Sequence, residues 1–155
     1  MSIINERVTH HHEGELVVFL IGMRVNRWWR PDLWLPVFGE MGPMLTELSK
    51  DPESGFLGFR TAMGLRGPTL IQYWDSVDKL YTYASNPAAA HRPAWSRFNR
   101  RARKAPGTVG IWHETFTVAR AESIYVGMPP VGLAKATSLV PVTKRLDRAR
   151  DRHAA

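Results

Sequence analysis

Apolar and polar positions along the chain predict four strands. Residues 15–25 are apolar at nearly every position, as expected for a central strand covered on both faces. Residues 55–65 and 69–74 read as two further strands joined by the turn Arg66-Gly67-Pro68. Residues 108–119, which follow Pro106-Gly107, are the fourth predicted strand, and we expect this strand to be central as well.

Two segments between these strands have the spacing of amphipathic helices. Residues 33–48 place apolar side chains at i, i+3, i+4 and i+7. Pro31 begins this helix, Asp32 is expected to help cap it, and the pair Gly42-Pro43 should kink or divide it. The second segment reads as two helical pieces, residues 77–84 with Asp75 or Ser76 as cap and residues 88–104, separated by Asn86-Pro87.

The order strand, helix, strand, strand, helix, strand is the split βαβ pattern of an α+β ferredoxin-like fold. Helices cover one face of such a sheet, so the other face needs a cover. Two sheets that pair face to face provide one, and the sequence therefore predicts a homodimer.

Three segments lie outside this core domain of residues 15–120. Residues 1–14 are polar, and His10, His11 and His12 in a row are expected to be solvated. Residues 121–142 contain prolines and glycines and are predicted to be an irregular, packed extension. Residues 143–155 are expected to form a frayed, charged helix or a disordered tail.

Composition excludes several classes of protein. The 155 residues include no cysteine, which excludes a disulfide scaffold, a thiolate metal site and a cysteine nucleophile. The longest clean apolar run, residues 16–23, is much shorter than the ~20 residues that span a bilayer. No signal peptide is recognisable at the start, so we expect a cytoplasmic protein without membrane association.

The net charge of +7 is concentrated in two places. Residues 92–104 contain six basic residues and no acid, and residues 144–152 contain five basic and two acidic residues. Trp95 and Phe98 lie on the other side of the predicted helix and are not interleaved with the cations. The pattern favours a solvated helix face over nucleic-acid binding, so we expect no nucleic-acid partner.

Titratable residues on the second helix and the last strand are candidates for chemistry. His91 shares the apolar stripe of its helix with Trp95, Phe98 and Ala102, so its imidazole could ligate heme iron or act as a base; a hydrogen-bonded core histidine is the alternative. In the last strand, alternation sends His113 to one face and Glu114 to the other. Each could serve as acid or base, and a structural polar network is equally compatible.

Polar residues at strand ends could orient a substrate. Arg24 and Asn26 share a face at the end of the first strand and, with Gln72, could bind an oxyanion or carbonyl; solvation of the strand end is the alternative. The chain has no phosphate-binding loop, nucleophile elbow or His-Glu-x-x-His zinc motif. No flavin or nicotinamide fingerprint is present either.

Five segments together resemble a bacterial and fungal monooxygenase-like family of the dimeric α/β-barrel superfamily, which also includes the antibiotic-biosynthesis monooxygenases. The segments are Val18 to Asn26, Gln72-Tyr73-Trp74, His91 to Trp95 with Phe98-Asn99, Gly110 to Glu114, and Tyr125 to Leu133. The resemblance covers roughly residues 5–140. It is specific for the family and much less so for a reaction.

The wider superfamily implies two models. Cofactor-independent members oxidise activated aromatic polyketides with O₂, and the substrate supplies the electrons. Heme-degrading relatives use a helix histidine as iron ligand with a tryptophan and an asparagine nearby. By resemblance His91, Trp74 and Trp95 would bind the cofactor, while Asn26 lies later in its strand than the pattern expects. Aldoxime dehydratases show that histidine-ligated heme in this superfamily need not imply oxygenation.

The leading hypothesis is a small monooxygenase that acts on an apolar or aromatic metabolite in a pocket between sheet and helices. Its catalytic residues would be His91, His113, Glu114, Arg24 and Asn26. The cofactor is unknown, and heme is one model. Two alternatives are a heme- or hydrophobic-ligand-binding protein without turnover and a structural dimeric interaction module.

Overall fold

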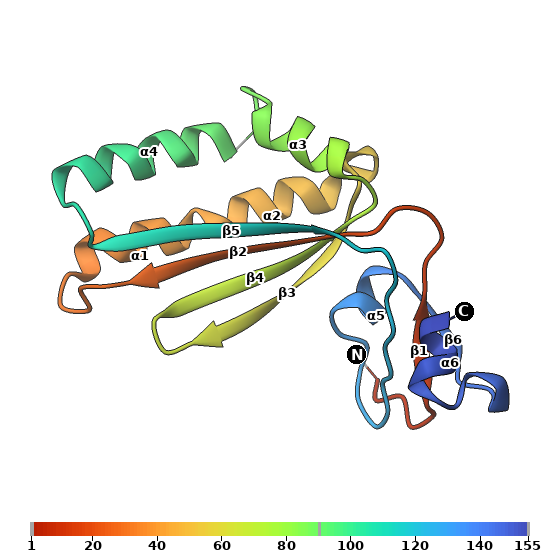
Figure 1. Cartoon of the computed structure of the whole chain (residues 1–155). Helices are drawn as coiled ribbons and strands as arrows, with labels where there is room; N and C mark the ends of the chain where they lie inside the picture. The colour runs from red at the N-terminus through yellow and green to blue at the C-terminus, as the bar shows by residue number, and fades with distance from the viewer. Residues whose placement is uncertain (1, 90, 155) are drawn as a thin grey trace.

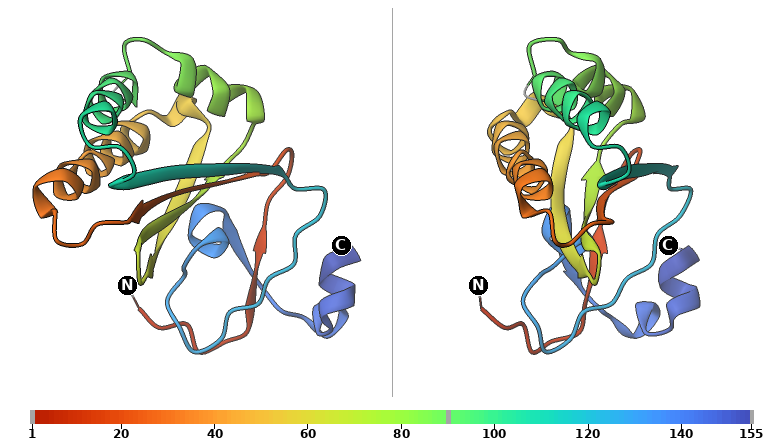
Figure 2. Two further views of the ribbon diagram at one scale, coloured as in Figure 1. Left: turned by 60° about the vertical axis from the view of Figure 1, so that its left-hand side comes forward. Right: turned by 90° about the vertical axis from the view of Figure 1, so that its left-hand side faces the viewer.

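The computed structural model describes residues 2–89 and 91–154 of the chain (Figure 1). A four-stranded sheet carries helices on one face, and a smaller two-stranded unit built from both ends of the chain lies beside it (Figures 1 and 2). The main domain contains β2 (Val17–Val25), α1 (Pro31–Gly39), α2 (Met41–Lys50), η1 (Pro52–Ser54), β3 (Phe56–Gly64), β4 (Gly67–Trp74), α3 (Val77–Ser85), α4 (His91–Lys104) and β5 (Val109–Thr117). The smaller unit contains β1 (Val8–His11), α5 (Leu133–Ala136), β6 (Ser138–Pro141), η2 (Lys144–Leu146) and α6 (Ala149–Ala154).

The main sheet is antiparallel with the strand order β3-β4-β2-β5. With the helices between its strands, this order is the α+β ferredoxin-like fold, as predicted. The continuous apolar run of β2 correctly indicated a central strand, because β4 and β5 pair on its two sides. The prediction that the last strand is central was wrong: β5 pairs with β2 alone and forms an edge of the sheet.

The first helical segment is divided at Glu40, where α1 ends and α2 begins. Pro43 stands in the first turn of α2, where its missing N–H costs no helical hydrogen bond. Asp32 does not cap α1 as expected; its carboxylate pairs with the Arg30 guanidinium at 2.7 Å. Ser76 caps α3 as predicted, since its hydroxyl accepts hydrogen bonds from the N–H groups of Asp78 and Lys79.

Two apolar clusters hold the helices on the sheet. One surrounds Trp74, which is fully buried and packs edge-on against Phe56 at 5.3 Å between ring centroids. Its fully or nearly buried partners are Val17, Leu48 and Leu80. The other consists of Met23, Val25 and Val37. Between these clusters the packing is incomplete, and a cavity remains.

The chain ends are more ordered than the sequence predicted. Residues 8–11 of the polar N-terminal segment form β1, which pairs with β6 of the extension. Residues 144–154 of the charged tail form η2 and α6. The tail is fixed by Arg152, whose side chain is 6% exposed and pairs with Glu122. A sequence window could not show the order of β1, because its partner strand β6 lies more than a hundred residues away in the chain.

The extension also covers part of the sheet face that the helices leave open. A Cβ placed at Gly132 would lie 3.0 Å from the Tyr73 hydroxyl, and one at Gly58 would lie 3.2 Å from the Ala136 Cβ. These contacts place α5 and its N-terminal side over β3 and β4, while the β2–β5 side stays open. Within residues 2–89 and 91–154, no helix combines the length and apolar character needed to cross a bilayer.

Candidate active site

A cavity of about 340 Å³ lies between the helix-covered face of the sheet and the helices. Its floor consists of β2 and β5, and its walls come from α1 to α4. Most lining side chains are apolar: Phe19, Ile21, Met23, Val37, Met41, Met44, Leu80, Tyr81, Ala84, Ala94, Trp95, Phe98 and Ile111. Four are polar: Glu40, His91, His113 and Thr115. A mostly apolar pocket with a few convergent polar groups is typical of a site for a small organic ligand.

His91 and His113 both line this cavity. The β2–β5 register sets Ile21 opposite His113, and strand alternation turns both toward the helices. His113 packs against Phe19 with 5.6 Å between ring centroids. His91 enters from the first turn of α4 and lies 6.4 Å from the Tyr83 ring. The fold therefore brings together two imidazoles that are 22 positions apart in the sequence.

The electrostatic environment of His91 favours its neutral form. Burial lowers its pKa below the ordinary value, the carbonyl of Ala84 opposes this, and Arg92 and His113 lower it further. Nδ1 of the ring is buried and has no hydrogen-bond partner within the described residues. A neutral imidazole nitrogen without a partner is a proton acceptor. Nδ1 is shielded from water in the free protein, so it takes this role for a bound molecule that displaces the atoms covering it.

Glu40 is a cavity residue that the sequence analysis missed. Its Oε1 accepts hydrogen bonds from Arg97 Nε and Arg101 Nη1, each at 2.9 Å, and its side chain is 15% exposed. The break between α1 and α2 is thereby held against α4. An acid at a helix junction, facing a segment with six bases and no acid of its own, is the signal that could have found it.

The same contacts show that the basic face of α4 is not wholly solvated, as the sequence analysis had predicted it to be. Arg97 and Arg101 are not wholly on the solvent side but turn toward the junction of α1 and α2. Trp95 and Phe98 stack at 5.4 Å and line the cavity, separate from these cations.

The remaining predicted site residues do not line the cavity. Arg24 and Asn26 hydrogen-bond one another, with Nε to Oδ1 at 3.0 Å, and Asn26 also donates to the Gly107 carbonyl at 3.1 Å. Glu114 is exposed on β5 and alternates away from His113. Trp74 lies in the core and donates through Nε1 to Gln72 Oε1 at 3.1 Å. Of the predicted residues, the fold brings His91, His113 and Trp95 together.

Heme does not fit this cavity well. The volume is near the lower end of the range of ~300–1,000 Å³ for ligand pockets, which favours a molecule smaller than a tetrapyrrole. The charged lining residue, Glu40, is an acid already bound by two arginines and offers nothing to the acidic propionates of heme. His91 could supply an axial nitrogen, but Trp74 lies in the core and Asn26 at a strand end. Separately, the described residues contain no group of three or more His, Cys, Asp or Glu side chains that could hold a metal ion.

The strand order and the cavity define a class: a ferredoxin-like protein with an apolar, imidazole-bearing pocket between sheet and helices. A family model described as monooxygenase af470-like matches residues 16–133, and the chain belongs to this family. This confirms the resemblance read from the sequence segments.

Monooxygenase af470 of Aspergillus fumigatus is 29% identical over 154 residues, an alignment that covers 90% of this chain and 53% of that protein. The chain thus spans about half the length of this relative.

Solved structures with a related arrangement include SnoaB, a cofactor-independent oxygenase from Streptomyces nogalater. The likeness has 15% identity, a TM-score of 0.47, and covers 70% of this chain and 97% of SnoaB. A dimeric ferredoxin-like protein of unknown function from Thermobifida fusca has 17% identity and a TM-score of 0.45, with coverage of 70% and 95%. A putative antibiotic biosynthesis monooxygenase from Caulobacter crescentus has 10% identity and a TM-score of 0.47, with coverage of 65% and 89%.

Proposed function

We propose that the protein is a monooxygenase that oxidises a small, apolar aromatic molecule with O₂ and without a bound cofactor. Family membership supports the reaction class. The observation that carries the rest is the apolar cavity in which a neutral His91 with an unpaired Nδ1 lies near His113. The substrate class follows from that lining, because an aromatic ligand gains most from apolar walls and a base acts on an acidic C–H or O–H group.

The proposed reaction begins when His91 takes a proton from an activated CH₂ group of the bound aromatic molecule. The resulting carbanion passes electrons to O₂, and a C–O bond forms. Loss of the second hydrogen and cleavage of the O–O bond give a carbonyl group and water. One O₂ converts CH₂ to C=O and H₂O, so the substrate supplies all electrons and no external reductant enters the balance.

The other cavity groups support this reaction in three ways. The imidazole of His113, exposed at one side of the cavity, positions the substrate or returns the proton to the departing oxygen. The apolar walls exclude water, which keeps the carbanion from reprotonation. Glu40 with Arg97 and Arg101 holds α1 and α2 against α4 and thereby maintains the walls.

The test uses dithranol, an anthrone with an activated CH₂ group, as probe substrate. O₂ uptake and formation of the quinone are measured for the native chain and for His91→Ala, His91→Gln and Ser96→Ala. Both His91 variants should lose about 10²–10⁴-fold in kcat/KM, the usual contribution of a general base. Ser96, an exposed residue of the same helix outside the cavity lining, serves as the matched control and should keep its rate.

A folded His91→Ala protein with the full rate would refute the proposed role of this residue. Saturable probe binding by the native chain without any O₂ uptake would instead favour the alternative of a ligand-binding protein without turnover. A hemin titration, followed by visible spectroscopy, tests the cofactor. A sharp Soret band that disappears in His91→Ala would contradict the cofactor-independent scheme.

We also propose that two copies associate through the open side of the sheet. Trp112 and Phe116 lie on this face of β5 and are 39% and 50% exposed. Exposed aromatic side chains on an uncovered sheet face favour a protein partner, and two such faces that pair favour a second copy, although Glu114 stands between the two rings. Sedimentation should show a dimer, and Phe116→Glu should shift the protein to the monomer; a native monomer at all concentrations would refute the proposal.

A further inference from the structure

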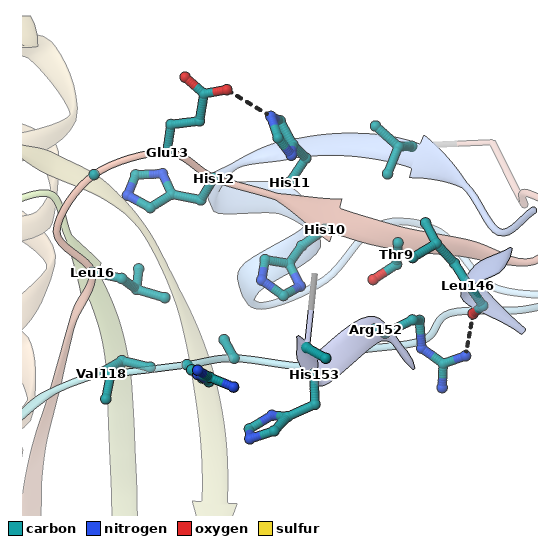
Figure 3. A pocket seen from close by; sticks show the side chains of 16 residues that line it. Thr9, His10, His11, His12, Glu13, Leu16, Val118, Leu146, Arg152 and His153 are labelled. Carbon is teal, nitrogen blue, oxygen red and sulfur yellow. Dashed lines mark hydrogen bonds and ion pairs between the residues drawn. The ribbon is translucent and has the colours of Figure 1, made fainter. Parts of the chain in front are cut away.

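A second cavity, with a volume of about 580 Å³, lies between β1, the chain that follows β5, and α6. It is separate from the apolar cavity in its lining and in its chemistry. Figure 3 shows the ring of His10 on the β1 side, pointing toward the segment that carries Val118 and the helix that carries Arg152 and His153, with the ring of His12 further along the chain that leaves β1. The titratable lining residues are His10, His11, His12, His153, Arg120, Arg152 and Glu13. The proposed oxidation uses none of them.

Two of the imidazoles are held in place through one ring nitrogen each. His10 Nδ1 lies 2.7 Å from the Ser123 hydroxyl, and His12 Nε2 lies 2.8 Å from the Glu15 carbonyl. Since a carbonyl only accepts, the His12 Nε2 donates. The second nitrogen of each ring has no hydrogen-bond partner among the described residues and is available to a ligand in the cavity.

The two arginines that line this cavity differ in how far their guanidinium groups are already paired within the protein. Arg152 is fully engaged: it pairs with Glu122 and donates to the carbonyls of Leu146 and Asp147 at 2.9 and 2.8 Å. Arg120 is exposed and has no ion-pair or hydrogen-bond partner within the described part of the chain. Arg120 is therefore the cation that a ligand in this cavity would meet.

We propose that this cavity binds a small polyanion, a diphosphate or tricarboxylate, held by the Arg120 guanidinium and by the free ring nitrogens of His10 and His12, where the His12 Nδ1 donates only in the protonated ring. Guanidinium and imidazole N–H groups are donors suited to charged oxygen atoms. A metal ion is the other ligand that imidazoles attract, but the described residues include no group of three or more His, Asp or Glu side chains that could hold one. The donor chemistry thus favours an anion over a cation.

The affinity should rise as the pH falls. Groups that face His10 are the imidazoles of His11 and His12 on its own segment and the carboxylate of Glu122 on the opposite one. Burial lowers the pKa of His10 most, His12 and His11 add to this, and Glu122 opposes it. These effects favour the neutral form of His10, and an anion beside it would raise its pKa by binding the protonated form more tightly. Four other titratable groups line the cavity and contribute to its electrostatic potential: His153, Glu13, Arg120 and Arg152.

Isothermal titration of the full chain with pyrophosphate and with citrate, at constant ionic strength, tests the proposal. Saturable binding near one equivalent is expected for at least one probe, tighter at about pH 6 than at about pH 8. Arg120→Gln should weaken it roughly 10-fold or more, as expected when a charge-assisted contact is lost. Arg145→Gln makes the same charge change at an exposed residue outside the lining and should leave the dissociation constant within about two-fold.

The relative affinity of the two probes distinguishes a phosphate-type from a carboxylate-type ligand. Bound ligand should also raise the melting temperature of the native chain, since it would bridge three segments of the folded state. Equal loss of affinity in Arg120→Gln and Arg145→Gln would indicate diffuse charge attraction and overturn the proposal. Absence of saturable binding for both probes at the lower pH would do the same.

Discussion

The contact between Gly22 and Trp112 on the open sheet face provides a sharp test of the packing. A Cβ atom at Gly22 would lie 2.5 Å from Cε2 and Nε1 of the indole and 2.6 Å from Cζ2. Carbon atoms pack at about 3.5–4.0 Å, so Gly22→Ala must displace the ring by about 1 Å or more. Overpacking of this kind costs about 1–3 kcal/mol. For a chain of this size the melting temperature should fall by roughly 2–12 °C.

Gly110→Ala is the matched control in the neighbouring strand. Gly110 pairs with Arg24, two positions along β2 from Gly22, and its added Cβ would lie 3.9 Å from the Arg24 Cβ, an ordinary contact. Neither glycine has a positive φ. Alanine at position 110 should therefore be neutral or should stabilise by up to about 1 kcal/mol, since it reduces the entropy of the unfolded chain.

Calorimetric melting of both variants separates the contact from the backbone effect. The double variant Gly22→Ala/Trp112→Ala should lose less stability than the sum of the losses in the two single variants. The reason is that the added methyl group clashes only when the indole ring of Trp112 is present. Equal melting temperatures for Gly22→Ala and Gly110→Ala would refute the reasoning. So would additivity of the double variant within about 0.5 kcal/mol.

Three further outcomes follow from the structure. Because burial lowers the pKa of His91 below 6.5, kcat/KM for the probe oxidation should rise with pH through an apparent pKa under that value. A profile that is flat between about pH 5 and pH 8 would contradict the role of His91 as the base. Arg152→Ala should destabilise the smaller unit by about 3–5 kcal/mol, since Glu122 and two carbonyls lose their partner. Proteolysis should then remove α6 first, and an unchanged cleavage pattern would count against this. Ser76→Ala should cost about 1 kcal/mol in urea unfolding through loss of the α3 cap, whereas Ser76→Asp should retain most of that stability.

Local features of the site were predictable from the sequence. The stripe that His91 shares with Trp95 and Phe98 follows from helix geometry, and all three line the cavity. The alternation of His113 with Glu114 follows in the same way from strand geometry, and only His113 faces the helices. These are statements about the faces of single elements, which backbone periodicity determines.

Relations between elements were not predictable in this way. Alternation in residues 109–117 is compatible with a central or an edge strand, and the edge position of β5 depends on which strand pairs with β2. Trp74 by sequence could line a cofactor site, but the packing of Phe56 and Leu80 around it makes it a core residue. The hydrogen bonds from Arg97 and Arg101 to Glu40 depend on how α4 lies across the junction of α1 and α2.

The sequence by itself thus determined the order of the elements, the faces of His91 and His113, and the family resemblance. Tertiary structure alone decided that these two imidazoles share one cavity, that Arg24, Asn26 and Glu114 lie outside it, and that both chain ends join in one sheet. The physical reason is that periodicity records the geometry of a few consecutive residues. Distances across the domain arise from the packing of surfaces that are far apart in the chain.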